Sequence, residues 1–219
     1  MMNYRLNIIC LLFMGYSSAF ISFGDEIIAG YRRDFRGQSP LISGWSYLWN
    51  SPEEWIPGKT PYNMWSGRIG QIDLYRSMKD AGGVWTADGD RKGENSTPDR
   101  HITLNAVGGH PGGGKEVYRN YEGRFAIAAY TISAPGNYAL SGTEISVRAS
   151  DVGDGVELIV HINNDAPLLR RHVASGEKVI FDLPLGTLKS GDTIYVGAGP
   201  WIHCYSDAFQ WDFSIVRKD

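Results

Sequence analysis

The feature that most constrains the fold is a series of short segments in the second half of the chain, in which apolar and polar residues alternate. Gly, Pro, Asn and Asp turns separate these segments, and none sustains the period of an amphipathic helix. The pattern predicts an all-β fold, a two-sheet antiparallel β-sandwich. The expected strands are Arg124–Ile132, Asn137–Arg148, Val156–Asn163, Pro167–Val173, Lys178–Leu183, Thr193–Ala198 and Phe209–Val216.

Alternation within two of these strands predicts which side chains enter the core, because successive strand residues point to opposite faces. In the strand that begins at Val156, we expect a core face and a wetter face that includes Glu157 and His161. Turn residues at 134–137 and 189–192 indicate two hairpin-type joints. The predicted core-facing residues are Val156, Leu158, Val160, Ile162, Phe209, Trp211, Phe213 and Ile215.

The part of the chain before residue 124 is less regular. Glu26–Arg36 alternates and predicts a first strand, and short strands are possible at Gly44–Trp49, Ile69–Tyr75 and Ile102–Leu104. Residues 88–114 consist almost entirely of turn-forming residues, and a loop of this length is usually functional or conceals strands. We predict a single β-sandwich domain over residues 20–219 with a long irregular N-terminal half.

The first 19 residues have the layout of a secretory signal peptide. Arg5 precedes the apolar run Leu6–Met14, and small residues up to Ala19 suit cleavage after that residue. The apolar run is too short to span a bilayer, and no transmembrane candidate follows. Removal of this segment leaves Cys204 without a disulfide partner, which suits a bacterial periplasm or exterior. We therefore expect a secreted or periplasmic protein.

The charge pattern argues against nucleic acid as a partner. The net charge is −3, and acidic and basic residues are mixed along the chain without a basic block. The glycine-rich stretch Gly108–Gly114 lacks the following helix and the Lys-Ser/Thr ending of a nucleotide-binding loop. The five histidines show no tight spacing with one another or with cysteine, so the sequence does not predict a zinc site.

Three segments carry a resemblance to a known family. Gly153–Asn164, Leu188–Val196 and Asp207–Ile215, with Gly44–Asn50 upstream, resemble the jelly-roll accessory domains of secreted bacterial polysaccharide-degrading enzymes. The resemblance covers roughly the second half of the chain and identifies a strand framework, not a ligand signature. It implies jelly-roll topology, carbohydrate binding by aromatic residues on loops or on the concave sheet, and often a structural calcium ion.

Trp201 is the first candidate for ligand contact. It lies in a loop between the last two expected strands, where an indole can offer its flat face to the apolar face of a sugar ring. Trp201 could equally fold inward and cap the sandwich, and Trp49, which shares a face with Trp45, could be core or part of a binding stripe. Sugar hydroxyls also require polar partners. The full candidate ligand-binding set is Trp201, His203, Tyr205, Asp207, His161, Asn163 and Trp49.

Two groups of carboxylates are candidate calcium ligands. Asp88, Asp90 and Glu94 lie in one glycine-containing turn, where alternate carboxylates can converge on a hard cation, although a solvated acidic turn explains them as well. The second group, Asp207 and Asp212, is suggested by the resembling domains, which often hold calcium near the last strand. Turn capping by Asp207 and a wet strand position for Asp212 are the alternatives.

The sequence favours a secreted protein that binds a polysaccharide or surface glycan without catalysis. One alternative is a glycan lyase or hydrolase, with Glu157, His161 and Asp212 as the acid–base candidates. Convergence of two of these three side chains in a cleft would favour the enzyme. The other alternative is a structural or adhesion protein whose aromatic loops contact protein.

Replacement of two tryptophans tests these assignments. Trp211→Ala should lower the free energy of unfolding by about 3–5 kcal/mol, because it removes a large core side chain. Trp201→Ala should change it little if that side chain is a surface platform. Urea denaturation of both variants measures the difference, and equally severe destabilisation would contradict the assignment of Trp201.

Overall fold

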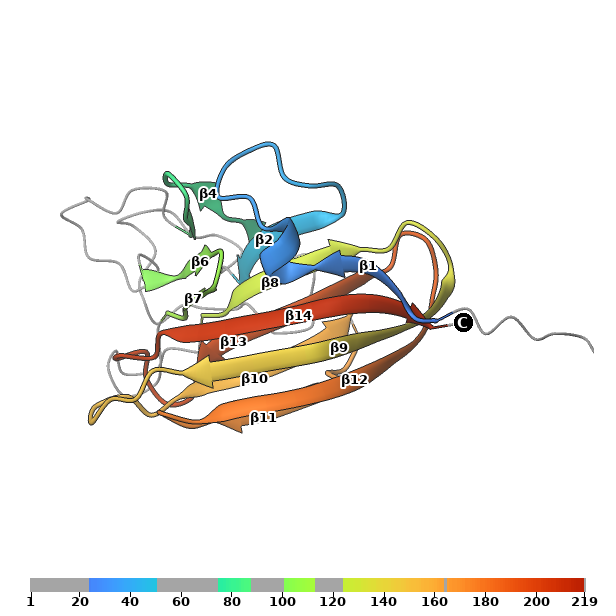
Figure 1. Cartoon of the computed structure of the whole chain (residues 1–219). Helices are drawn as coiled ribbons and strands as arrows, with labels where there is room; N and C mark the ends of the chain where they lie inside the picture. The colour runs from blue at the N-terminus through green and yellow to red at the C-terminus, as the bar shows by residue number, and fades with distance from the viewer. Residues whose placement is uncertain (1–23, 51–74, 88–100, 113–123, 164, 219) are drawn as a thin grey trace, which may run out of the picture.

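A computed structural model describes residues 24–50, 75–87, 101–112, 124–163 and 165–218. Within these ranges the chain forms two antiparallel sheets that pack against each other (Figure 1). The main apolar core contains residues from both sheets. The predicted all-β, two-sheet sandwich is therefore confirmed, whereas the jelly-roll topology stays a prediction.

The first sheet is built around the long strand β14. Its strands follow the order β12 (Lys178–Leu188), β9 (Gly136–Val147), β14 (Phe209–Lys218), β7 (Gly108–His110), β6 (Thr103–Asn105), β5 (Trp85–Thr86) and β4 (Lys79–Asp80), and β1 (Glu26–Gly30) also pairs with β14. The second sheet has the order β11 (Leu169–Val173), β10 (Val156–Ile162), β13 (Thr193–Pro200), β8 (Ala126–Thr131), β2 (Trp45–Asn50) and β3 (Tyr75–Ser77).

All seven strands expected in the second half of the chain are present. β12 continues five residues past the expected end at Leu183, through Pro184 and Gly186. The register with β9 shifts between Phe181 and Leu183 and again between Pro184 and Gly186, which breaks the alternation on which the sequence prediction relied. Proline is tolerated there because β12 lies at the edge of its sheet.

The two predicted hairpin joints connect strands of different sheets, so their interpretation as hairpins is wrong. The turn at 134–137 links β8 in the second sheet to β9 in the first, and the turn at 189–192 links β12 to β13. Turn residues indicate that the chain reverses, but they carry no information about which sheet the next strand joins.

The expected first strand is shorter than predicted. β1 ends at Gly30, and Tyr31–Asp34 forms α1, a single helical turn. The Asp34 carboxylate accepts a hydrogen bond from the Gly30 amide at 2.9 Å, which stabilises this turn. Tyr31, the first residue of this turn, points into the sandwich and is fully buried.

Tyr31 lies at the centre of an aromatic cluster that joins the two sheets. Its ring centroid lies 6.2 Å from Trp45 and 6.3 Å from Tyr47 in β2, and 5.4 Å from Trp211 and 5.5 Å from Phe213 in β14. The Tyr31 hydroxyl donates a hydrogen bond to the backbone oxygen of Asn105 at 2.7 Å, which satisfies its polar end. The predicted core positions in β14 are thus confirmed.

The two faces of β10 are both buried, which corrects the expectation of a wetter second face. The predicted core face enters the main core as expected. On the opposite face, Ile159 is 2% and His161 is 1% exposed. A second apolar cluster explains this burial, because Ile159 packs there with residues of β8 and β13. Its buried members are Phe125, Ile127, Ala129, Ile159 and Tyr195.

Gly155, directly before β10, is a position where the backbone requires glycine. Its φ is +100°, and a Cβ atom there would lie 2.2 Å from the Val173 backbone oxygen. Gly191 has a similar φ of +91° and open space around it. A substitution at Gly191 therefore measures the cost of the positive φ without steric overlap.

Gly191→Ala should therefore lower the free energy of unfolding by about 1–3 kcal/mol through φ alone. Gly155→Ala should lower it by a further ~1–3 kcal/mol, because the strands must move apart. Urea denaturation of both variants measures the difference, and equal values would contradict the close approach of Gly155 to β11.

Candidate functional site

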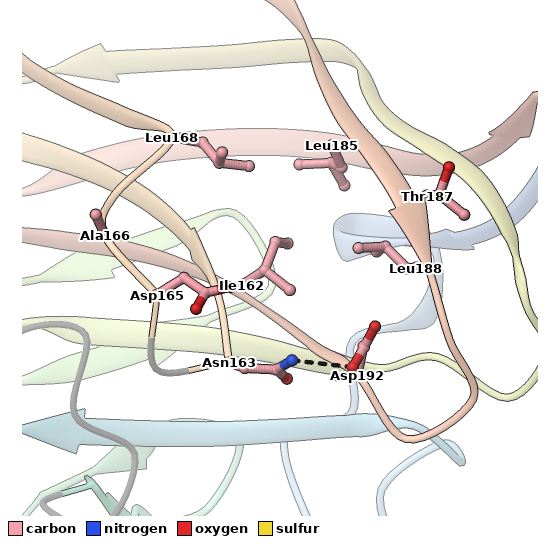
Figure 2. A pocket seen from close by; sticks show the side chains of 9 residues that line it. All are labelled: Ile162, Asn163, Asp165, Ala166, Leu168, Leu185, Thr187, Leu188 and Asp192. Atoms are coloured by element: carbon pink, nitrogen blue, oxygen red, sulfur yellow. Dashed lines mark hydrogen bonds between the residues drawn. The ribbon is translucent and has the colours of Figure 1, made fainter.

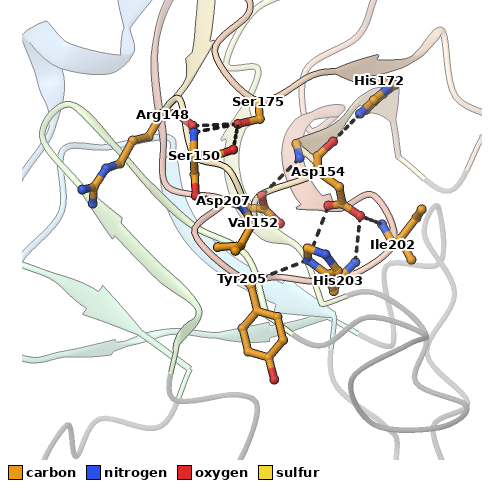
Figure 3. Close-up of polar contacts among 11 residues, drawn as sticks. Arg148, Ser150, Val152, Asp154, His172, Ser175, Ile202, His203, Tyr205 and Asp207 are labelled. Atoms are coloured by element: carbon orange, nitrogen blue, oxygen red, sulfur yellow. Dashed lines mark hydrogen bonds and ion pairs between the residues drawn. The ribbon is translucent and has the colours of Figure 1, made fainter.

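The candidate site lies at the end of the sandwich where β13 ends and β10 begins. Val156 is paired with Pro200 across these strands, and the Trp201 amide donates a hydrogen bond to the Gly155 backbone oxygen at 3.3 Å. Strand pairing therefore places the segment before β10 beside the segment that follows β13. Figure 3 shows the polar contacts between the two segments.

Trp201 begins an exposed loop, which we call the aromatic loop (residues 201–205). Its side chain is 48% exposed, and one face of the indole stacks on His172 with ring centroids 4.4 Å apart and an interplanar angle of 17°. His172 comes from β11 and its Nε2 lies 2.8 Å from the Asp154 backbone oxygen. The imidazole thus supports the indole from behind while roughly half of Trp201 stays accessible to solvent.

Asp154 connects the segment before β10 to the aromatic loop. Its Oδ2 accepts hydrogen bonds from the amides of Ile202 at 3.0 Å and His203 at 3.3 Å. Two backbone donors on one carboxylate oxygen fix both the loop and the orientation of the carboxylate.

Asp207 is the most deeply buried polar residue of the site, with no exposed surface. Its Oδ1 accepts a hydrogen bond from the Gly155 amide at 3.1 Å. Burial raises the pKa of Asp207 to about 7; the Gly155 amide lowers it in part, and the neighbouring Asp154 carboxylate raises it again. Near neutral pH this carboxyl group therefore lies close to its titration point.

His203 completes a cluster of three potential ligands. Its Nδ1 lies 3.7 Å from Asp154 Oδ1 and accepts a long hydrogen bond from the Tyr205 amide at 3.4 Å. One candidate ligand atom from each of Asp154, His203 and Asp207 lies within 4.8 Å of the other two. The cluster can hold either a cation or a proton shared between the carboxylates.

Two of the predicted ligand-binding residues lie at the other end of β10. Asn163 follows β10, seven residues beyond Val156, or about 23 Å along a strand. Its side chain donates to Asp192 Oδ1 at 2.9 Å and accepts from the Thr193 amide at 2.9 Å, so it shapes a turn. His161 is buried and stacks on Tyr195 at 4.7 Å. The prediction that these residues share a site with Trp201 is wrong.

Asn163 lines a different pocket, of about 220 Å³ (Figure 2). This volume is below the range of ordinary ligand pockets, about 300–1,000 Å³. Leu168, which is 48% exposed, lies on its rim. The residues that line it come from the end of β10, the segment between β10 and β11, β12 and the turn before β13: Ile162, Asn163, Asp165, Ala166, Leu168, Leu185, Thr187, Leu188 and Asp192.

The structure also bears on Trp49 and on the two candidate calcium groups. Trp49 is 2% exposed and belongs to the main core, so its prediction as a ligand platform is wrong. Asp212 does not join Asp207, because its Oδ1 accepts the amides of Arg32 at 3.1 Å and Phe213 at 2.9 Å. The first candidate calcium group (Asp88, Asp90 and Glu94) lies outside the described residues, as does the predicted signal peptide.

The three acid–base candidates do not converge. Glu157 forms an ion pair with Arg170 on β11, and Asp212 lies on β14 in the other sheet. His161 lies on the same face of β10 as Ile159, and its burial there lowers its pKa. The convergence in a cleft that would favour an enzyme is therefore absent from these three residues.

Sequence reasoning missed Asp154 and His172. Asp154 stands between two glycines directly before a predicted strand, which is a signal for a turn at a strand end where a polar side chain meets neighbouring loops. His172 carries no such signal, because its role depends on the pairing of β10 with β11, which places Glu157 opposite His172 and brings the ring near the start of β10.

No family model and no curated protein matches the chain. Two crystal structures of a β-glucosidase from Kluyveromyces marxianus are similar to parts of it. The glucose complex has a TM-score of 0.32 with 13% identity and covers 59% of this chain and 15% of that one. The selenomethionine-labelled form has a TM-score of 0.31 with 12% identity, and covers 89% and 18%. The chain thus spans less than a fifth of that enzyme, and likeness at these TM-scores carries no argument about function.

Within the described ranges, no helix combines the length and hydropathy required to cross a bilayer.

The raised pKa of Asp207 predicts a specific pH dependence of stability. Between about pH 4, where an unfolded aspartate titrates, and pH 7, the folded state binds more protons than the unfolded state. The free energy of unfolding should therefore fall as pH rises through this window, by up to about 1.4 kcal/mol per pH unit. Asp207→Asn, which cannot titrate, should show a shallower fall.

Urea denaturation from pH 4 to pH 8, with a chelator present throughout, measures the difference between the wild type and Asp207→Asn. Parallel pH profiles for the two proteins would contradict a raised pKa at Asp207.

Proposed function

We propose that this protein binds a carbohydrate without transforming it, through the aromatic loop. The observation that carries the proposal is the half-exposed indole of Trp201, held in a defined orientation by its stack on His172. A sugar ring has an apolar C–H face that packs on a flat indole. An indole that is already fixed loses less conformational entropy when a ligand binds.

Polar groups in the same loop as Trp201 would meet the second requirement of a sugar site. Tyr205 is 52% exposed, and Figure 3 shows its hydroxyl directed away from the polar cluster. His203 is partly exposed next to it, with ring centroids 5.4 Å apart. Stacking on Trp201 would provide most of the binding free energy, and these side chains would orient the sugar hydroxyls.

The proposed setting is outside the cytoplasm. We propose that residues 1–19 direct export and are then removed, and that the protein acts as a secreted or periplasmic glycan-binding domain. Its ligand would be a polysaccharide or surface glycan, because an open loop platform suits an extended chain better than a small molecule that requires enclosure.

The test is binding of the purified protein to a panel of polysaccharides that includes cellulose, xylan, mannan, β-1,3-glucan and peptidoglycan. We expect retention by at least one of them, and at least a tenfold loss of affinity in Trp201→Ala, equivalent to about 1.4 kcal/mol. Leu168→Ala is a matched control, because Leu168 is also 48% exposed but lies at the pocket at the other end of β10.

The outcomes separate the alternatives. Loss of binding in Leu168→Ala alone would move the ligand to the Asn163 pocket and overturn the role of Trp201. A folded wild-type protein that none of the polysaccharides retains would overturn the carbohydrate proposal. The adhesion alternative would then account for the exposed apolar side chains of Trp201 and Ile202, together with Val152.

A further inference from the structure

The polar cluster beneath the aromatic loop contains two buried carboxylate oxygens without a hydrogen-bond donor. Among the described residues, Asp154 Oδ1 and Asp207 Oδ2 are buried and have no hydrogen-bond partner. The other oxygen of each carboxylate is bound by backbone amides, from Ile202 and His203 for Asp154 and from Gly155 for Asp207. The backbone therefore orients both carboxylates so that the unpartnered oxygens point into the cluster.

Two neighbouring carboxylates cannot both stay charged and unpartnered in a buried position, because the desolvation penalty of each charge adds to their mutual repulsion. Asp207 has no exposed surface, so water does not compensate its charge directly. Three kinds of compensation are open to the pair: a proton shared between the carboxylates, a protonated His203 beside Asp154, or a bound cation.

The third member of the cluster supplies a further ligand that a metal ion would need. His203 Nδ1 lies 3.7 Å from Asp154 Oδ1, and the Tyr205 amide lies 3.4 Å from this nitrogen, a long contact that a metal ion would replace. An imidazole nitrogen is a good ligand for a transition metal.

The donor set and spacing fit zinc better than calcium. Calcium takes six to eight oxygen ligands, whereas zinc takes four ligands from His, Asp and Glu in a tetrahedron, often with one water. Two ligands of a tetrahedral zinc ion lie about 3.4 Å apart. The three donors here, within 4.8 Å of one another, can approach that separation through small side-chain rotations.

We propose that Asp154, His203 and Asp207 bind a single zinc ion, with water as the fourth ligand, and that this ion holds the aromatic loop in place. Two of the three ligands, His203 and Asp207, lie within or just after the loop, and the third accepts hydrogen bonds from two of its amides. The metal site stands independently of carbohydrate binding, and only its effect on binding rests on the proposed function.

Isothermal titration of the chelator-treated, dialysed protein with zinc chloride and, separately, with calcium chloride tests the proposal. We expect one equivalent of zinc to bind, a higher melting temperature with zinc, and at least tenfold weaker binding of calcium. His203→Gln and Asp207→Asn should each weaken zinc binding at least tenfold. Their circular dichroism and melting in chelator show whether each variant still folds.

Two matched controls exclude binding elsewhere. Asp212→Asn makes the same substitution on β14 outside the cluster, and His101→Gln removes an exposed histidine whose ring lies 5.8 Å from that of His110. Both should bind zinc as the wild type does. Loss of zinc binding in His101→Gln with normal binding in His203→Gln would overturn the proposal.

Three further results of these experiments distinguish zinc binding from the alternatives. Calcium binding as tight as zinc binding, with no effect of His203→Gln, would show that the imidazole is not a ligand. If the folded protein binds no zinc and Asp207→Asn is the more stable protein at pH 7, the carboxylates share a proton. Zinc binding with no retention on polysaccharides would leave the metal site standing and overturn only the carbohydrate proposal.

Discussion

The packing of Tyr31 between the two sheets is the contact on which the rest of the structure depends. Its ring touches Trp45 and Tyr47 from one sheet and Trp211 and Phe213 from the other. Because the Tyr31 side chain contacts both sheets, the position of the short helix α1 fixes the distance between them. The described residues contain a single cysteine, Cys204, so no disulfide joins the sheets within them and apolar burial holds the sheets together.

The candidate site takes its rigidity from this core. Asp154 lies two residues before Val156 and Asp207 two residues before Phe209, and both of these strand residues are buried. Each carboxylate is thus positioned by an adjacent strand end, while Trp201 directly follows the last residue of β13. Side chains that leave a rigid framework at one end can hold a ligand or an ion with little loss of conformational entropy. The same proximity to the core explains why Asp207 is fully buried.

The residues predicted from sequence show where pattern analysis succeeds. Alternation identified β10 and β14 and placed Trp211 in the core, because a strand that packs against another sheet must repeat every two residues. It misjudged the opposite face of β10, since a sheet buried on both sides removes the polar half of the signal. For Trp49, the sequence could not distinguish a core stripe from a binding stripe, because both require an aromatic residue on one face.

The candidate site was only partly predictable for a related reason. Trp201, His203, Tyr205 and Asp207 lie within seven residues of one another in the sequence, so the sequence alone predicts that they are close in space. Asn163 was expected to be a polar partner in the same site, but it follows the far end of β10 and therefore lies at the opposite end of the sandwich. Zinc-type ligands were not predicted because Asp154 and His203 are 49 residues apart, and only the pairing of β10 with β13 brings them together.

The sequence by itself determined the secondary structure class, the core faces of β10 and β14 and the position of the aromatic loop, because these depend on residues within a few positions of one another. The tertiary structure alone decided that β12 and β13 belong to different sheets and that His172 supports Trp201. It also decided that two carboxylates and an imidazole meet beneath the loop. These contacts join residues from separate strands, and the energy that brings them together is the burial of the whole core, which no local pattern records.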